Sequence, residues 1–398
     1  MSENLASCIL RSGRDKSVRL KHPWIFASAI SAIEGTPSDG DTILVRTSEG
    51  EALGRAAYSG ASQIRARMWT WDAEEEVDEQ FLFTKINSSI EKRKKFVISE
   101  AADSYRLIFG ESDGIPGLIV DQYKDSLVIQ ILSVGVEQRK ELICEMINSI
   151  FPGNRIYERS DVDVRALEGL QPRVGLIHGK ALPATNWIQE YGIKYLLDIK
   201  HGQKTGFYLD QRENRHKVGQ YCLDKDVLNC FSYSGGFTLN ALKGGAQKVT
   251  SIDSSQSALD LMDINIRKNQ INPEKSSSIC GDVFKELRYM RDKAQFFDVI
   301  ILDPPKFAPT TSQAEKAARG YKDINLLALK LLRPGGVLFT FSCSGGTSRD
   351  LFQKIVTGAA LDAGADIQII DVLSQAADHP VLLSFPESMY LKGLVCVK

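Results

Sequence analysis

The stretch VLNCFSYSGGFTLNALKGGAQKVTSID (227–253) decides the fold class of this 398-residue chain. It opens with an apolar run typical of a buried strand and then turns at Gly235-Gly236. Helical spacing follows as far as Gly244-Gly245, and KVTSID reads as a second strand. The same alternation of strands and helices continues to GGVLFTFS (335–342). The sequence therefore predicts an α/β fold with a doubly wound parallel sheet in the C-terminal half.

Three regions differ in their patterning. Residues 1–72 carry short alternating runs broken by glycine and polar turns, which predict a small β domain. Residues 73–185 combine a helical stretch with hairpin-like strands and predict an α+β middle domain, and the parallel sheet occupies 186–398. Two final strand-like runs, ADIQIIDVL and SMYLKGLVCVK, have no long helix between them. We expect these two runs to pair antiparallel at the sheet edge.

Composition excludes several classes of protein. Hydrophobic residues make up 43% of the chain and charged residues 25%, as in an ordinary globular protein. No apolar run approaches the ~20 residues that span a bilayer, so we expect no membrane partner. The seven cysteines include no C-x-x-C pair, which argues against a zinc or other structural metal site and indicates free thiols. With no signal-like N-terminus, the expected location is cytoplasmic.

Acidic residues follow three of the predicted parallel strands. Asp253 ends KVTSID, Asp282 follows SSSIC, and Asp303 ends FDVIILD. Open α/β sheets bind ligands beyond the carboxyl ends of their strands, where the glycine turn would also lie. One acid at a strand end is commonly a helix N-cap, but a succession of them indicates a ligand site.

These features distinguish between two cofactors. A dinucleotide site needs a full G-x-G-x-x-G turn for its pyrophosphate, and FSYSGGF does not complete one. S-adenosylmethionine has no phosphate. Its ribose hydroxyls suit Asp253, its adenine amino group suits Asp282, and its α-ammonium group suits a further strand-end acid. The sequence therefore predicts S-adenosylmethionine as the cofactor.

At the level of motifs, the chain resembles the bacterial ribosomal RNA large subunit methyltransferase I family. The motifs are NCFSYSGGF, SIDSSQSAL, ILDPPKF, ARGYKDIN, FTFSCSG, QAADHP, GQKTGFYLDQR, GESDGIPGL, HPWIF and SQIRAR. The resemblance implies a PUA-like RNA-binding domain at the start, a class I (Rossmann-like) methyltransferase domain at the end, and methylation of cytosine C5 in 23S ribosomal RNA. The implied partner is this RNA, naked or in an early assembly particle, and the protein could be a monomer or a homodimer.

By position, the resemblance also implies the cofactor contacts. They are Asp210, Arg212, Phe231, Ser232, Tyr233, Asp253, Ser254, Asp282, Val283, Asp303 and Pro304.

Cys343 stands where the last parallel strand ends, beside the turn Gly345-Gly346. It is either a small residue that closes a strand or a nucleophile. C5 of cytosine is unreactive until a thiolate adds to C6, and a partly exposed strand-end thiol suits that role. We therefore expect Cys343 to be the nucleophile, with Asp303 binding the cofactor ammonium or the cytosine edge.

Residues of three further motifs are candidates for RNA contacts. Arg65 and Arg67, close to aromatic residues, form a predicted phosphate-contacting face, and solvated surface is the alternative. Lys306 and His379 are candidate contacts near the base, although a surface lysine and a structural histidine are the ordinary readings. Two rival functions stay open: a methyltransferase acting on a purine or exocyclic nitrogen, which needs no cysteine, and a non-catalytic RNA-binding protein.

Overall fold

The computed structural model describes residues 5–307 and 314–398, so residues 1–4 of the predicted first domain lie outside it. Its internal contacts divide the chain into two compact units. Unit 1 comprises Met1–Ile188, Leu197–Leu209 and Ala377–Ser388, and unit 2 comprises Gln189–Leu196, Asp210–Ala376 and Met389–Lys398. The short segment 377–388 therefore belongs with residues far away in the sequence, which its local pattern did not predict. Within the described residues, no helix is long and apolar enough to cross a membrane.

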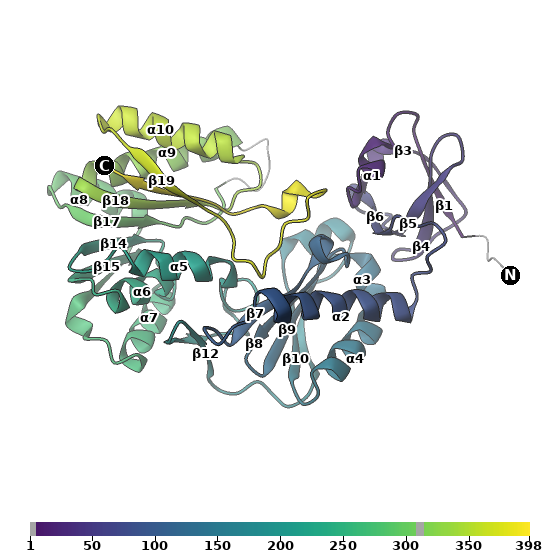
Figure 1. The fold of residues 1–398 in the computed structure, drawn as a ribbon, viewed down its shortest axis with the longest axis horizontal. Helices are drawn as coiled ribbons and strands as arrows, with labels where there is room; N and C mark the ends of the chain where they lie inside the picture. The colour runs from purple at the N-terminus through teal and green to yellow at the C-terminus, as the bar shows by residue number, and fades with distance from the viewer. Residues whose placement is uncertain (1–4, 308–313) are drawn as a thin grey trace. The chain divides into compact units, whose positions relative to one another are not determined.

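Unit 1 begins with a six-stranded sheet in the order β2-β6-β5-β4-β1-β3 (Figure 1). Its strands are β1 (Ser7–Leu10), β2 (Trp24–Phe26), β3 (Ile30–Glu34), β4 (Thr42–Arg46), β5 (Ala52–Tyr58) and β6 (Ile64–Thr70), with the short helices α1 (Lys16–Arg19) and η1 (Ala27–Ala29). Alternate residues of β4 are buried, as the sequence pattern predicted. Their side chains join an apolar cluster that includes Leu10, Ile43 and Met68.

The second sheet of unit 1 has the order β11-β10-β9-β8-β7. Its strands are β7 (Ser104–Phe109), β8 (Leu118–Tyr123), β9 (Ser126–Ile131), β10 (Arg155–Ser160) and β11 (Arg173–His178), and its helices are α2 (Glu79–Phe96), α3 (Val134–Gln138), α4 (Lys140–Ile150), η2 (Gly110–Asp113) and η3 (Asp163–Glu168). Turns at Asp113-Gly114 and Lys124-Asp125 join β7 to β8 and β8 to β9, in keeping with the predicted hairpin-like strands. Because this sheet and the first one each have an apolar cluster, we propose 1–72 and 73–185 as separate domains.

Unit 2 contains a seven-stranded sheet in the order β16-β15-β14-β17-β18-β20-β19. The strands are β14 (Asp226–Cys230), β15 (Lys248–Asp253), β16 (Ser276–Cys280), β17 (Phe297–Leu302), β18 (Leu332–Ser342), β19 (Gln368–Leu373) and β20 (Lys392–Val397). The first five are parallel, and β20 runs antiparallel between β18 and β19. The structure thus confirms both the parallel sheet and the antiparallel pair.

Helices cover both faces of this sheet (Figure 1). One face carries α5 (Arg212–Gly219), α6 (Gly236–Lys243) and α7 (Gln256–Lys268), and the other carries α8 (Val283–Asp292), α9 (Ala314–Leu331) and α10 (Arg349–Ala363). The core between the second group and the sheet includes Leu228, Ile300, Tyr321 and Phe352. The remaining short elements are β12 (Asn186–Glu190), β13 (Ile193–Leu197), η4 (Leu209–Gln211), η5 (Pro273–Lys275) and η7 (Pro386–Ser388).

Side chains fix where several of these helices begin. Ser255, Asp282 and Ser348 each accept a hydrogen bond from a backbone N–H in the first turn of α7, α8 and α10. These bonds satisfy N–H groups that have no partner within the helix. Each helix start is thereby placed directly after a strand or its following turn, at the edge of the sheet where the candidate residues lie.

Candidate functional site

The turn after β14 has a backbone conformation that few residues adopt. Phe231 and Tyr233 have φ values of 60° and 47°, and Gly235 follows with φ 81°. A Cβ on Gly235 would lie 2.3 Å from Cγ of Met262, so only glycine fits there. Non-glycine residues in the left-handed region are strained, and such strain concentrates at functional sites. The turn therefore has the character of a ligand-binding loop.

Asp253 holds this turn in place. Its Oδ2 accepts a hydrogen bond of 2.7 Å from the backbone N–H of Tyr233, and its Oδ1 accepts one of 2.9 Å from Ser255. Each carboxylate oxygen can accept a second hydrogen bond, so both retain capacity for ribose hydroxyls. The neighbouring Ser254 is exposed.

Asp282 lies exposed after β16, and its Oδ1 accepts a hydrogen bond of 3.0 Å from the N–H of Lys285. It is therefore the N-cap of α8, the ordinary role that the sequence left open for strand-end acids. Val283, the first residue of that helix, is buried. A carboxylate that caps a helix has further acceptor positions, so the cap is compatible with a contact to adenine.

Asp303 follows β17 and is partly buried. Its Oδ1 accepts a hydrogen bond of 3.0 Å from the side-chain amide of Gln211. Gln211 in turn accepts one of 2.6 Å from Asn214. Neither amide residue was among the predicted site residues, because nothing in the local pattern links η4 and α5 to the end of β17. Pro304 is buried, whereas Lys306 is exposed.

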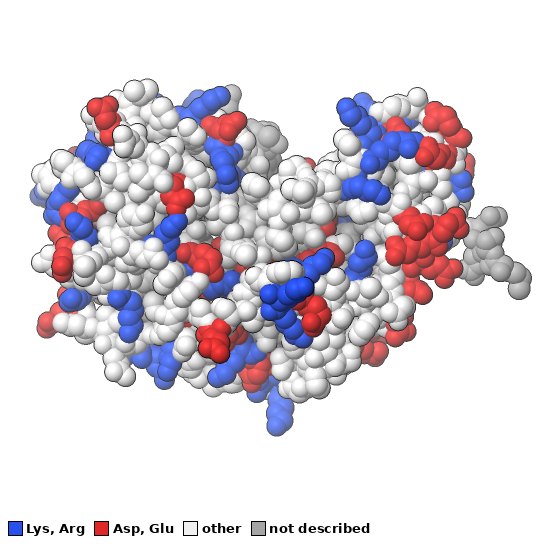
Figure 2. All heavy atoms as spheres, in the orientation of Figure 1, with Lys and Arg blue, Asp and Glu red and all other residues white. Residues whose placement is uncertain are grey.

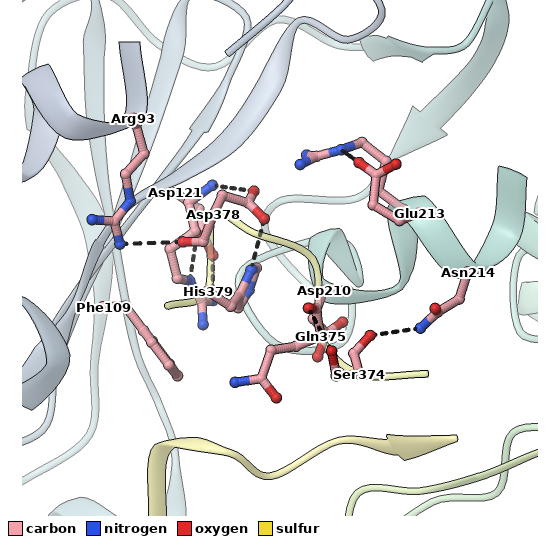
Figure 3. A network of polar contacts seen from close by, with 12 residues as sticks. Arg93, Phe109, Asp121, Asp210, Glu213, Asn214, Ser374, Gln375, Asp378 and His379 are labelled. Atoms are coloured by element: carbon pink, nitrogen blue, oxygen red, sulfur yellow. Dashed lines mark hydrogen bonds and ion pairs between the residues drawn. The ribbon is translucent and has the colours of Figure 1, made fainter. Parts of the chain in front are cut away.

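The two predicted residues of the YLDQR motif are buried. Asp210 accepts a hydrogen bond from the hydroxyl of Tyr390 at 2.5 Å, and its backbone carbonyl accepts one from Ala376. Arg212 lies 3.1 Å from a carboxylate oxygen of Glu213. Figure 3 shows Asp210 beside the backbone of Ser374 and Gln375. The side-chain amide of Asn214 donates a hydrogen bond to the carbonyl oxygen of Ser374. These contacts give both residues a structural role in unit 2.

The residues present fit S-adenosylmethionine. Oγ of Ser232 is buried and has no hydrogen-bond partner among the described residues, so it is available to a polar ligand at the turn. Asp253 ends β15, and Asp282 and Asp303 follow β16 and β17. Because these three strands are parallel members of one sheet, their carboxylates come to the same edge. A cationic, hydroxyl-rich ligand without phosphate matches this set of acceptors.

Two of the seven cysteines are accessible at this edge of the sheet: Cys343 is partly exposed directly after β18, and Cys280 is exposed at the end of β16. The Sγ of Cys343 lies 4.0 Å from the carbonyl oxygen of Pro304 in the turn after β17. Burial raises the pKa of five other thiols. The pKa rises to about 12 for four of them and by more for Cys230. These five are Cys8, Cys144, Cys222, Cys230 and Cys396. The exposed Cys280 makes a contact of 3.6 Å to the carbonyl of Ser254.

Comparison with known proteins identifies the group to which this architecture belongs. Residues 174–365 match the family described as S-adenosylmethionine-dependent methyltransferase, and residues 8–71 match the PUA-like domain. The ribosomal RNA large subunit methyltransferase I of Aeromonas salmonicida is 52% identical over 97% of this chain and 98% of that protein. Its counterpart from Escherichia coli O157:H7 is 48% identical over 98% of both chains. This chain belongs to the ribosomal RNA large subunit methyltransferase I family.

The fold is shared more widely. A methyltransferase named SMU.776, crystallised with SAH, aligns with a TM-score of 0.87 at 22% identity, covering 98% of this chain and all of that one. The predicted resemblance, fold class and cofactor are thus confirmed, and the protein is an S-adenosylmethionine-dependent methyltransferase with a PUA-like domain.

The two predicted RNA-contacting arginines differ in their surroundings, and those of Arg67 depart from the expectation. Arg67 is buried, and its guanidinium lies 2.8 Å from Glu111 and 3.0 Å from Glu168. Arg65 donates to the backbone carbonyls of Ser59 and Gly60. The structure therefore corrects the expectation that Arg67 offers its charge to phosphate, since two carboxylates already neutralise it. Basic and acidic side chains are mixed on the face in Figure 2, in keeping with the net charge of −1.

His379 belongs to unit 1 and is buried. Its Nδ1 lies 3.0 Å from Oδ1 of Asp378, and Oδ2 of Asp378 accepts a hydrogen bond from the backbone N–H of Arg106 (Figure 3). Arg93 donates to the carbonyl oxygen of Asp378. This network matches the structural role that a lone histidine usually has and gives no support to a contact with RNA.

Lys392 is a further residue near the thiol, and its sequence motif did not predict it as a site residue. It is the first residue of β20, pairs with Ser342 of β18, and is buried. Its ammonium group donates a hydrogen bond of 2.7 Å to the carbonyl oxygen of Ser344, the residue after Cys343. The one available signal was a lysine at the start of an otherwise apolar strand, KGLVCV.

Proposed function

We propose that the protein methylates C5 of a cytosine in large-subunit ribosomal RNA, with Cys343 as the nucleophile that activates the base. The observation that carries this proposal is the placement of Cys343: a partly exposed thiol at the end of β18, against the turn that holds Asp303 and Pro304. The family name and the PUA-like domain support ribosomal RNA as the substrate. All seven cysteines are free thiols, which suits a reducing compartment such as the cytoplasm.

The chemistry follows from the unreactive character of C5. Addition of the Cys343 thiolate forms an Sγ–C6 bond and shifts the electron pair of the C5–C6 double bond to C5. Bound S-adenosylmethionine supplies an electrophilic methyl group. After C5 has gained this methyl group, a base removes the C5 proton, the electron pair of that C–H bond re-forms the double bond, and the thiolate leaves. Cys343 thus ends the cycle unchanged.

The other residues at this edge have binding roles in the proposal. Asp253, Asp282 and the turn 231–235 hold the cofactor, and Asp303 lies between the cofactor side and the thiol. Pro304 and Pro305 have no backbone N–H and form a rigid turn beside the thiol, suited to a flat base. Because a stacked base is inaccessible to the thiol, the target cytosine must be unpaired or flipped out of its helix.

Labelled S-adenosylmethionine and unmodified 23S ribosomal RNA test the proposal directly. We expect label in 5-methylcytidine after digestion to nucleosides, and no label with Cys343→Ala. Cys280→Ala is the matched control, because Cys280 is the other accessible thiol. Label in a methylated purine, or undiminished activity of Cys343→Ala, would contradict the thiol mechanism and favour a nitrogen methyltransferase.

A trapping experiment isolates the adduct. In RNA that contains 5-fluorocytidine, fluorine replaces the proton that must leave C5, so the Sγ–C6 bond cannot break by elimination. We expect a protein–RNA species that survives denaturing electrophoresis and requires both the cofactor and Cys343. Absence of this species with active wild-type enzyme would reject the covalent step.

A further inference from the structure

We infer that Lys392 is a positioning residue that stabilises the thiolate of Cys343. This inference rests on the proposed function and assigns a role to a residue outside the acidic cofactor site. Its first support is the register of the sheet: Lys392 of β20 pairs with Ser342 of β18, the residue before Cys343. The ammonium group then donates to the carbonyl of Ser344, the residue after Cys343.

Burial of this charge without an acidic partner needs an explanation. Lys392 is 5% exposed, and among the described residues no carboxylate forms an ion pair with it. A buried ammonium is costly unless a negative charge compensates it. A thiolate at Cys343 supplies such a charge next to the strand that carries Lys392. Structural anchoring alone would need only a neutral hydrogen-bond donor for the Ser344 carbonyl.

The charges around Lys392 agree with this pairing. Burial lowers the pKa of Lys392 to about 8, and in the part of the chain that the structure describes the negative charge of Cys343 is the nearby influence that raises it. Lys306, after β17, and Arg349, at the start of α10, act in the lowering direction because they are cations. The thiol therefore lies in a positive environment, the setting that favours thiolate over thiol.

The segment that carries the thiol is also held rigidly. The Oγ of Ser344 lies 2.9 Å from the hydroxyl of Tyr321, which is buried in α9. The neighbouring Ser342 is fully buried in β18. With the residues on both sides of Cys343 held, the ammonium and the thiol keep a fixed relationship. The same positive charge would stabilise the thiolate again when the Sγ–C6 bond breaks.

Alkylation of Cys343 by iodoacetamide measures its thiolate without any methyl transfer. The rate is followed from pH 6 to 10 by mass spectrometry of the peptide, with Cys280 of the same molecule as an internal reference. In Lys392→Met we expect Cys343 to react about tenfold more slowly at pH 7, because loss of the positive charge would raise the pKa of the thiol by about one unit. The difference should vanish at high pH, where the thiol ionises in either protein, and Lys392→Arg should restore the wild-type profile.

Two further variants separate charge from anchoring. Lys392→Gln keeps an N–H donor and loses the charge, so it should behave like Lys392→Met and serves if that variant does not fold. Lys398→Met is the matched control, because Lys398 donates to the carbonyls of Leu329 and Leu332 from the other end of β20. It should leave the profile of Cys343 unchanged.

The inference fails if Lys392→Met and Lys392→Gln change the alkylation rate by the same factor at every pH, or do not change it. That result is distinct from failure of the proposed function, which would appear as full methylation by Cys343→Ala whatever the alkylation profile.

Discussion

The carboxylate of Asp253 accepts a hydrogen bond of 2.7 Å from the backbone N–H of Tyr233, and so joins the end of β15 to the turn after β14. Tyr233 has φ 47°, a conformation that needs support from its surroundings. One acid thus shapes this turn and keeps acceptor capacity for a ligand. We propose that the same carboxylate has both a structural and a binding role.

This double role predicts the behaviour of Asp253→Ala. We expect S-adenosylmethionine affinity to fall at least tenfold, since the variant loses the ribose acceptor and the support of the turn. Isothermal titration calorimetry measures the change. Asp263→Ala, an exposed acid on α7, is the control and should bind normally. Equal cofactor affinity of the Asp253 and Asp263 variants would show that Asp253 does not contribute to cofactor binding.

Asp282 allows its cap and its ligand contact to be separated. Asp282→Ala should lower the free energy of unfolding by about 1 kcal/mol, because α8 loses its N-cap. Asp282→Asn keeps an oxygen that caps the helix, so its stability should stay near that of the wild type. Denaturant titration and cofactor binding are measured for both. If Asp282→Asn binds the cofactor as tightly as the wild type, the carboxylate is a cap and no more.

Arg67 should matter for stability more than for RNA. Arg67→Ala leaves Glu111 and Glu168 without their shared partner, and breaking such a buried pair costs about 3 kcal/mol. Chemical denaturation measures this loss. Arg65→Ala, which removes hydrogen bonds to two carbonyls, should cost less. A fully stable Arg67→Ala protein that binds RNA with a weaker salt dependence would restore the phosphate role originally expected of Arg67.

Lys392 predicts an unusual pH dependence of stability. Burial lowers the pKa of Lys392 to about 8 in the folded protein, from the ordinary 10.5 of a lysine, so the unfolded state binds more protons between these two pH values. The stability of the wild type relative to Lys392→Met should therefore rise from about pH 8 to pH 10.5. Below pH 8, the folded protein carries the whole free-energy cost of the buried ammonium group. Denaturant titrations at pH 7 and pH 10 measure the difference, with Cys343→Ala in both proteins so that the thiol does not titrate. If the difference in the free energy of unfolding between the two proteins is the same at both pH values, Lys392 does not become a buried charge on folding.

Much of unit 2 could be predicted from its local pattern. The runs VLNCF, KVTSID and FDVIILD became β14, β15 and β17, because apolar runs bounded by glycine turns have few alternatives to a buried parallel strand. The acids that follow β15, β16 and β17 then had to meet at one edge, since parallel strands end on the same side of a sheet. The motifs also identified the family, and relatives with 48–52% identity confirm it.

The roles of individual charged residues needed the tertiary structure. Arg67 looked like a surface cation in its strand, but its partners Glu111 and Glu168 lie 44 and 101 residues away in the sequence. The segment 377–388, with His379, joins unit 1 although both flanking segments belong to unit 2. Pairings of this kind depend on chain topology, and local propensity carries no information about them.

The sequence by itself determined the elements of unit 2, the edge where its acids gather and the thiol that ends β18, because these depend on periodicity and on the rules of parallel sheets. Only the tertiary structure decided what surrounds that thiol. Lys392 reaches the segment that carries Cys343 because β20 inserts antiparallel beside β18 and brings residues 48 apart, Ser344 and Lys392, into hydrogen-bonding contact. Strand register in three dimensions, rather than any local pattern, set the electrostatic environment of Cys343.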